Sequence, residues 1–368
     1  MNKILIHSNY SPQNFGGIEY VVKNIIGALS DRNSYELVCF FGSNSSGQTY
    51  DSDLHSQIIF RKCYLKINGA SFLSFGNYFF LRQGISSNLI IYQEPYPTLW
   101  PSIFILNRIL KKKLIVIIHA DPNSHPLINF FYEKFRSIVF KNSKFVFTSK
   151  KLLEDIGGSL DGQQSTIPLA IQDINVDLFQ PNFFYNLPKK YALFFGRLAQ
   201  YKGIEVLLEA SLIIPSIPIV IAGDGPLAGF ILDFINSKKL KNVIFINESF
   251  DESDKISLIR NCSFLVFPSI NKNEAFGLIQ LEAMRSGKAI INTSLNTGVN
   301  FVAPHGVCAH TINPNSCVEL SNAINLLWNN EGLSSQLGKE GRNRFINYFE
   351  LSNFRASWVN IVLTTLKY

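Results

Sequence analysis

The chain has 368 residues, of which 46% are hydrophobic and 17% charged, and its formal net charge is +7. This composition excludes an intrinsically disordered protein, and no uninterrupted apolar run approaches the ~18 residues of a membrane-spanning helix. The five cysteines have no CxxC spacing, which argues against a disulfide framework and a cysteine zinc site and favours a reducing cytoplasm.

The first half of the chain alternates between short apolar runs and helical patterns. Residues 3–7 predict a first strand and not a signal peptide, and apolar residues three and four apart over 18–29 predict an amphipathic helix. Residues 41–54 are rich in serine, glycine and asparagine and predict a loop. Because the strand runs lack polar alternation, we expect a parallel sheet that is covered on both faces. The further strands are expected at 36–41, 89–92, 114–118 and 145–148.

The same pattern restarts after a polar stretch near 171–190. Two successive alternating blocks predict an α/β protein with two doubly wound domains, whose ligands bind beyond the carboxyl ends of the strands. Strands are expected at 191–195, 217–222, 243–246, 264–267 and 289–291, and a final helix over 354–365. The expected organisation is an N-terminal domain at 1–172, a linker at 173–190, a C-terminal domain at 191–349 and a closing helical segment at 350–368.

Basic residues are concentrated in the first half of the chain. Residues 1–170 hold 17 Lys and Arg against 11 Asp and Glu, a net +6, whereas the remainder holds 17 against 16, a net +1. The excess predicts an anionic partner, such as a phosphate-bearing ligand, an acidic membrane surface or nucleic acid; a merely solvated face is the alternative. We expect most of these cations, Lys134 and Arg136 included, to be solvated. Aromatic residues at 130–132 and Phe135 interleave with them, a mixture typical of a membrane edge.

Two loops of the second block contain residues suited to phosphate. Arg197 and Lys202 stand in the loop that follows the strand at 191–195 and opens the next helix. Fixed cations near a helix N-terminus suit a diphosphate, although loop cations are often only solvated. The Gly223–Gly225 turn, after the strand at 217–222, is either a further phosphate contact or a plain strand-to-helix turn.

A third loop contains two glutamates. Glu274 stands just before a predicted helix, at whose start Phe276 and Gly277 offer backbone N–H groups. Glu282 lies further along that helix, on its ligand-facing side or as an ordinary surface residue. Because a carboxylate can accept two hydroxyl hydrogen bonds, both suit the vicinal diols of a ribose or a hexose. The fourth loop, at 296–299, could add backbone N–H groups.

The first block offers a smaller set of candidates. Gly16 and Gly17 precede the amphipathic helix, where backbone amides can point at an anion. His119 closes the run at 114–118 with Asp121 nearby, and is either a ligand-facing or a structural histidine. The Asp51–Asp53 segment has the DxD form of some metal sites, but we expect it to be solvent-exposed and expect no metal.

Together these loops resemble family 4 (group one) of the retaining glycosyltransferases with the GT-B architecture. The resemblance runs over nearly the whole chain, and the paired-glutamate segment EAFGLIQLEAM is its most specific part. Residues 93–97 and 296–299 resemble the branch found in bacterial surface-polysaccharide pathways. The other matching segments are Gly16–Glu19, Gly196–Leu198 with Lys202–Gly203, and Ala222–Leu227.

The resemblance implies two facing Rossmann-like domains, with a final helix that crosses back to the first. It implies a catalytic set in which Arg197 and Lys202 bind the donor diphosphate, Glu274 binds the transferred sugar, and His119 lies by sugar and acceptor. Glu282 would hold the ribose hydroxyls. The nucleotide sugar is the co-substrate, with no metal and no other cofactor. The further donor-binding positions are Gly16, Gly17, Gly223, Phe276, Gly277 and Leu278.

We therefore expect a cytoplasmic glycosyltransferase, peripherally associated with the inner membrane, that moves a hexose from a nucleotide sugar. GDP-mannose is the favoured donor, and the expected acceptor is a polyprenyl-diphosphate-linked glycan of O-antigen or capsule synthesis. The basic first half suits that diphosphate and an anionic leaflet. Two alternatives remain: a nucleotide-sugar epimerase of GT-B shape, and a basic binding protein without catalysis. No recognised nucleic-acid module is present, so no nucleic-acid partner is expected.

Overall fold

The computed structural model describes residues 2–8, 17–30, 35–43, 47–51, 56–62, 65–67, 70–72, 76–94, 96–119, 126–179 and 187–367. The chain divides into two units. One comprises Met1–Leu169 together with Leu351–Tyr368, and the other comprises Ala170–Glu350.

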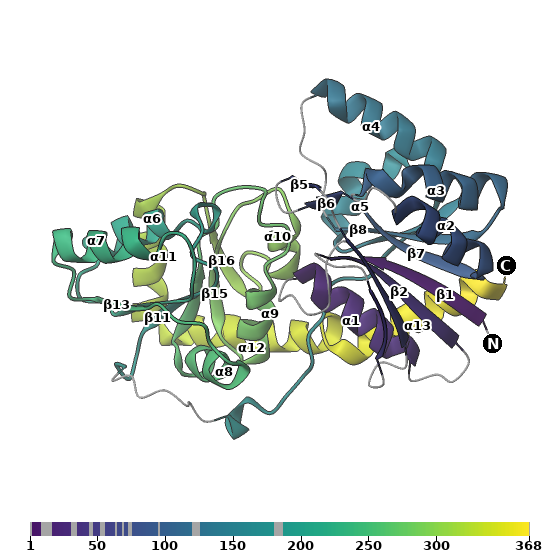
Figure 1. Ribbon diagram of the computed structural model, residues 1–368. Helices are drawn as coiled ribbons and strands as arrows, with labels where there is room; N and C mark the ends of the chain where they lie inside the picture. The colour runs from purple at the N-terminus through teal and green to yellow at the C-terminus, as the bar shows by residue number, and fades with distance from the viewer. Residues whose placement is uncertain are drawn as a thin grey trace. The chain divides into compact units, whose positions relative to one another are not determined.

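The first unit is built on an eight-stranded sheet of strand order β10-β9-β8-β7-β1-β2-β4-β3 (Figure 1). Neighbouring strands are parallel except β3 and β4, which pair antiparallel at the sheet edge. Its strands are β1 (Asn2–Ser8), β2 (Tyr35–Ser43), β3 (Gly47–Asp51), β4 (Ser56–Lys62), β7 (Leu89–Glu94), β8 (Lys113–Ile118), β9 (Ser143–Phe147) and β10 (Gly162–Thr166). A separate antiparallel pair is formed by β5 (Leu65–Ile67) and β6 (Ala70–Phe72).

Helices cover both faces of this sheet (Figure 1). One face packs on α2 (Gly76–Ser86), α3 (Trp100–Phe104) with the π-helical turn Ile105–Ile109, α4 (Pro126–Val139) and α5 (Lys150–Ile156). The opposite face carries α1 (Gly17–Ser30) and α13 (Leu351–Lys367), which pack against each other. Phe354, Trp358 and Val362 form the buried face of α13, and Lys113 Nζ donates to the carbonyl oxygen of Leu366 at 2.8 Å. The final helix therefore returns to the first unit, as predicted.

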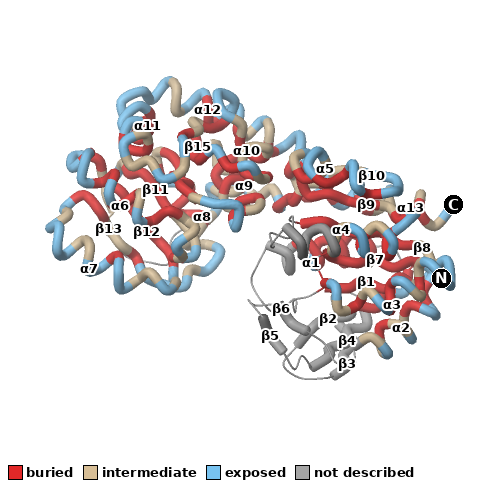
Figure 2. The backbone as a smooth tube through the Cα atoms, turned by 90° about the horizontal axis from the view of Figure 1, so that it is seen from above, coloured by how far each residue is buried: buried red, intermediate tan, exposed pale blue. Residues whose placement is uncertain are grey.

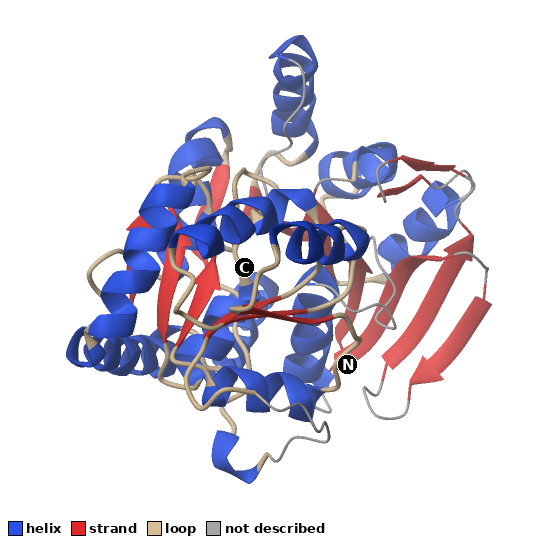
Figure 3. Ribbon diagram, turned by 90° about the vertical axis from the view of Figure 1, so that its left-hand side faces the viewer, coloured by secondary structure: helices blue, strands red, loops and turns tan. Residues whose placement is uncertain are grey.

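The second unit has a six-stranded, wholly parallel sheet of order β13-β12-β11-β14-β15-β16. Its strands lie between two helical layers (Figure 3), and most of their residues are buried (Figure 2). The strands are β11 (Ala192–Phe195), β12 (Ile219–Ala222), β13 (Val243–Ile246), β14 (Phe264–Phe267), β15 (Ala289–Thr293) and β16 (Ala309–Ile312). One layer contains α6 (Ile204–Ile213), α7 (Ala228–Lys238) and α11 (Cys317–Asn329); the other contains α8 (Glu252–Asn261), α9 (Leu278–Arg285) and α12 (Glu331–Tyr348).

All ten predicted strands overlap strands of the structure, and the predicted helix over 18–29 corresponds to α1. The predicted loop at 41–54 is wrong, because it contains the end of β2 and the whole of β3. β3 has the polar sequence GQTYD and lies at the sheet edge with only β4 as a neighbour. An edge strand does not need the continuous apolar run of a central parallel strand.

None of the helices in the described ranges combines the length and the apolar character that crossing a bilayer would require.

Candidate active site

The strand order of the second sheet locates its binding edge. Numbered within the sheet, the order is 3-2-1-4-5-6, that of the doubly wound nucleotide-binding fold. The order reverses between β11 and β14, and ligands of such sheets bind where the loops from the two strands diverge. Arg197 lies two residues after β11, and Ser269 lies two residues after β14. The switch point therefore brings these loops to one edge of the sheet.

The two loops approach each other closely at a glycine. Gly203 has a left-handed φ of +70°, and a Cβ there would lie 2.0 Å from the carbonyl oxygen of Pro268. Only glycine permits this separation and this φ without strain. Lys202, the preceding residue, is thereby held against the end of β14, with its ammonium 5.3 Å from the centre of the Phe267 ring.

Lys202 and Glu274 form an ion pair at this edge. Lys202 Nζ lies 2.5 Å from Glu274 Oε2, and the Ser269 hydroxyl donates to the same oxygen at 3.1 Å. The side chains of Lys202 and Glu274 are only 15% and 9% exposed. Arg197 is exposed and forms no ion pair within the described part of the chain. The structure thus brings together two residues that the sequence singled out 72 positions apart, and adds Ser269, which the strand-end criterion could have identified.

Glu282 lies on α9 and faces α8. Its Oε1 lies 3.1 Å from Lys255 Nζ, which also contacts Glu252 at 2.8 Å. Burial raises the pKa of Glu282, an effect that the Lys255 ammonium opposes. Burial alone would lower the pKa of Lys255, but the two carboxylates outweigh it and the net pKa is raised. Glu282 Oε2 is buried and has no hydrogen-bond partner among the described residues, so Glu282 is not an ordinary surface residue.

The glycine-rich positions of this unit lie around the same edge. Gly223 follows β12, and a Cβ there would lie 1.9 Å from the carbonyl oxygen of Gly196. Gly277 is the residue before α9 with a φ of +79°, and Leu278 is the first residue of that helix. Phe276 is buried and its ring packs edge-on against Phe349 at 6.3 Å.

In the first unit, His119 follows β8 directly and is 7% exposed. Burial lowers its pKa to about 4, so the imidazole is neutral at pH 7. Its Nε2 has no hydrogen-bond partner in the described ranges, and the same holds for both amide atoms of Gln93, which is 1% exposed. Gln93 pairs in register with Ile117. Because successive strand residues alternate between faces, Gln93 and His119 lie on the same face of neighbouring strands.

Two further candidates of the first unit are Gly16 and Gly17. Gly17 is the first residue of α1. Gly16 lies outside the described residues, as do Asp121, Ser52 and Asp53. Among the described residues, no three His, Cys, Asp or Glu side chains gather into a potential metal site.

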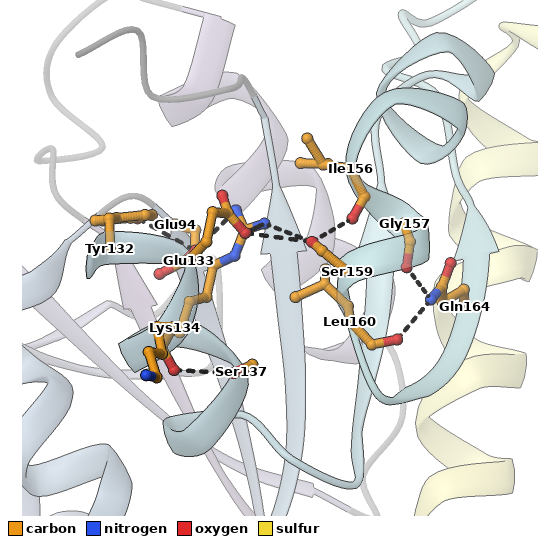
Figure 4. A network of polar contacts seen from close by, with 11 residues as sticks. Glu94, Tyr132, Glu133, Lys134, Ser137, Ile156, Gly157, Ser159, Leu160 and Gln164 are labelled. Carbon is orange, nitrogen blue, oxygen red and sulfur yellow. Dashed lines mark hydrogen bonds and ion pairs between the residues drawn. The ribbon is translucent and has the colours of Figure 1, made fainter. Parts of the chain in front are cut away.

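A buried polar network lies on the face of this sheet opposite to Gln93 (Figure 4). Glu94, the last residue of β7, accepts hydrogen bonds from Trp100 Nε1 at 3.1 Å and from the Tyr132 hydroxyl at 3.3 Å. Arg136 is 1% exposed, 2.5 Å from Glu133 and 4.0 Å from Glu94. The prediction that Arg136 is solvated is therefore wrong, because two carboxylates stabilise it inside. Burial raises the pKa of Glu94 to about 7, an effect that Arg136 opposes.

Comparison with known proteins identifies relatives of this chain. A family model described as "Glycosyl transferases group 1" matches residues 178–344. Along 100% of its length the chain is 26% identical to O-antigen chain mannosyltransferase C of Escherichia coli, and covers 99% of that protein. It is 31% identical to the D-rhamnosyltransferase WbpZ of Pseudomonas aeruginosa over 163 residues, which are 44% of this chain and 42% of that protein.

Among solved structures, sucrose-phosphate synthase from Thermosynechococcus elongatus superimposes with a TM-score of 0.74 at 18% identity, with 99% of each chain covered. This likeness concerns the fold, and it confirms the predicted GT-B architecture.

Proposed function

We propose that the chain, which a family model of group 1 glycosyltransferases matches over residues 178–344, is a retaining enzyme that transfers a hexose from a nucleotide sugar to a lipid-linked glycan. The proposed pathway is O-antigen or capsule synthesis, and the favoured donor is GDP-mannose. The relatives support this choice, since one is named an O-antigen chain mannosyltransferase and another a D-rhamnosyltransferase.

The observation that carries the proposal is the cation pair at the switch point. Lys202 is fixed at the end of β14 by Gly203 and Glu274, and Arg197 is exposed after β11. In sugar transfer, negative charge accumulates on the departing nucleoside diphosphate. Cations that are already in place stabilise this charge in the transition state without reorganising. Arg197 and Lys202 would supply that charge, so we propose that no metal ion or other cofactor is needed.

The two glutamates would orient the donor. Glu282 has one carboxylate oxygen, Oε2, that no described residue uses. A ribose hydroxyl would satisfy it, while the Lys255 ammonium, 3.1 Å from Oε1, opposes the rise in pKa that burial causes. Glu274 would accept hydroxyl hydrogen bonds from the transferred sugar, and backbone N–H groups at Phe276 and Gly277 would assist.

Residues of the first unit would bind hydroxyl groups. Neutral His119 and the Gln93 amide together offer donors and acceptors that no described residue uses. Buried polar groups without partners cost about 1–3 kcal/mol each, and a hydroxyl-bearing sugar or acceptor would recover part of this. Gly16 and Gly17 would let the backbone approach the phosphates. In a retaining mechanism in which the leaving group and incoming hydroxyl share one face of the sugar, no protein nucleophile is required.

The proposed lipid-linked acceptor requires access to a membrane. In the first unit, α2, α3 and α4 lie on the same face of the sheet (Figure 1). The exposed apolar side chains of this layer include Ile109 of the π-helical turn after α3, at 62% exposure, and Phe135 and Ile138 of α4, at 57% and 48%. Two exposed cations are nearby in the chain, Lys134 on α4 and Lys111 in the loop between the π-helical turn and β8. Apolar residues among cations suit an anionic leaflet, so we propose peripheral association with the inner membrane of a cytoplasmic enzyme. No nucleic-acid partner is proposed.

Vesicle sedimentation tests the membrane proposal. Wild-type protein should sediment with vesicles that contain phosphatidylglycerol and remain in solution with pure phosphatidylcholine. The Phe135→Ser/Ile138→Ser variant should lose most of the binding while its melting temperature is retained. Equal binding by the variant and the wild type would remove α4 from the proposal.

A transfer assay tests the proposed chemistry. Purified protein is incubated with GDP-mannose or with UDP, dTDP and ADP sugars, with and without a polyprenyl-diphosphate-linked oligosaccharide. We expect labelled sugar in the lipid fraction only when acceptor is present, with the anomeric configuration of the donor. Epimerised nucleotide sugar in the absence of acceptor would favour the epimerase alternative. Nucleotide-sugar affinity that survives Arg197→Ala/Lys202→Ala would favour a protein that binds without catalysis.

A further inference from the structure

We propose that Gln280 is a positioning residue that aims the backbone N–H groups of Phe276 and Gly277 at the donor. The inference rests on the proposed function, in which these N–H groups assist Glu274 at the transferred sugar; here they also donate to the phosphate that joins this sugar to the nucleotide. It adds a residue of the EAFGLIQLEAM segment whose side chain is buried and cannot itself touch the donor.

The Gln280 side chain is 0% exposed, and its orientation is fixed by its partners. Its Nε2 donates to the carbonyl oxygens of Phe276 at 3.2 Å and Val299 at 3.3 Å. Its Oε1 accepts from Asn292 Nδ2 at 3.0 Å. Rotating the amide by half a turn would set its oxygen against two carbonyl oxygens, so only one orientation satisfies the buried groups.

Asn292 is fixed in turn by the sheet. It lies on β15, where its Nδ2 also donates to the carbonyl oxygen of Ala303 at 2.9 Å. Its Oδ1 accepts from the Thr311 hydroxyl at 2.7 Å, and Thr311 is its register partner on β16. The hydrogen-bonded series Thr311–Asn292–Gln280 therefore links the loop before α9 to β15 and to its neighbour β16 at the edge of the sheet.

The peptide groups of that loop are held by their carbonyl oxygens. The carbonyl oxygen of Ala275 accepts from the N–H of Gly298 at 2.8 Å, and that of Phe276 accepts from Gln280. In a planar trans peptide, the N–H points opposite to the C=O. The N–H groups of Phe276 and Gly277 consequently point away from Gly298 and Gln280, and neither donates to another described residue.

The peptide group between Phe276 and Gly277 is restrained little by Gly277 itself. Gly277 has a left-handed φ of +79°, and a Cβ there would lie 2.7 Å from the ring of Phe267. Glycine is thus required at this turn, but it is also the residue that resists peptide rotation least. The carbonyl of Phe276 needs an external restraint, and Gln280 provides it. Preorganised donors of this kind contribute to catalysis because they need not reorient as charge develops.

The test compares Gln280→Met, which fills the same space without hydrogen bonds, with Asn242→Leu as a matched control. Asn242 is also a buried amide that donates to loop carbonyls, those of Ser211, Ile214 and Ile217, but it lies at the amino end of β13, away from the site. Melting temperature, kcat, and the Kd values of GDP and guanosine are measured for each; if another donor base binds, its diphosphate and nucleoside replace these.

Both variants should melt at lower temperature than the wild type. Only Gln280→Met should weaken GDP binding, by about tenfold, with guanosine affinity unchanged and kcat reduced. Thr311→Val, which removes only the outermost hydrogen bond, should weaken GDP binding about threefold, and it decides the matter if Gln280→Met does not fold. Unchanged GDP affinity, or equal losses for GDP and guanosine, would overturn the positioning role alone. A wild-type protein that binds no nucleoside diphosphate would overturn the proposed function as well.

Discussion

Replacing Glu274 by glutamine should tighten the binding of nucleoside diphosphate while it abolishes sugar transfer. In the structure, the carboxylate lies 2.5 Å from the Lys202 ammonium, and both side chains are less than one-fifth exposed. The carboxylate therefore neutralises the cation proposed to bind the diphosphate, and it also repels the incoming anion. Ser269 can still donate to the oxygen of the substituted amide, so the loop keeps its main contact.

The magnitude follows from the environment of the pair. The net contribution of an exposed ion pair is about 0–1 kcal/mol, whereas the Coulomb attraction alone between two charges ~4 Å apart near a protein surface is about 4 kcal/mol. The net interaction of the mostly buried Lys202–Glu274 pair should lie between these two values. Its removal should therefore strengthen diphosphate binding by about 1–2 kcal/mol, or roughly five- to thirtyfold in Kd.

Isothermal titration with GDP, and with UDP if that base is preferred, measures the change in Kd. Glu282→Gln is the matched control and should weaken binding, because that carboxylate is proposed to hold the ribose. A Glu274→Gln variant that binds diphosphate no better than the wild type would show that Glu274 does not weaken diphosphate binding.

Three further predictions concern the supporting structure. Gly203→Ala should lower the melting temperature and reduce kcat more than tenfold, because the new Cβ would clash with the carbonyl oxygen of Pro268. The control Gly229→Ala, in an open helical position, should leave the melting temperature unchanged or raise it. His119→Ala should lower kcat by the same factor at pH 8 and pH 5.5, because the buried imidazole stays neutral down to about pH 4; a factor that shrinks below pH 6.5 contradicts this. Because the pKa of Glu94 is about 7 in the fold against 4.5 unfolded, the unfolded chain loses this proton at a lower pH than the folded chain does. The free energy of unfolding should therefore fall by about 3 kcal/mol between pH 4.5 and 7. Urea titrations should show that Glu94→Gln lacks this fall, and parallel curves for the variant and the wild type would contradict the prediction.

Sequence patterns predicted the central strands because a strand buried on both faces has to be continuously apolar. The runs at 89–92 and 264–267 are of this kind, and both are fully buried. The edge strands β3 and β10 have the polar sequences GQTYD and GQQST. Such segments cannot be distinguished from loops by periodicity, because a single neighbouring strand is enough to hold them.

The candidate site was predictable where residues follow strands directly. Arg197, Lys202 and Glu274 were found on this criterion, together with the family resemblance. Lys255 and Gln280 were not, because their roles depend on contacts with residues of other elements of the fold, Glu282 for Lys255 and Asn292 for Gln280, which no sequence pattern indicates. Arg136 was misassigned as solvated, because a cation in an amphipathic helix gives no sign that two distant carboxylates meet it inside.

A crystal structure of the protein with a bound nucleoside diphosphate would test directly whether Arg197 and Lys202 form the diphosphate site. We expect diphosphate oxygens within hydrogen-bond distance of Lys202 Nζ and the Arg197 guanidinium, with the N–H groups of Phe276 and Gly277 directed at the same ligand. A diphosphate bound away from the carboxyl ends of β11 and β14 would contradict this expectation.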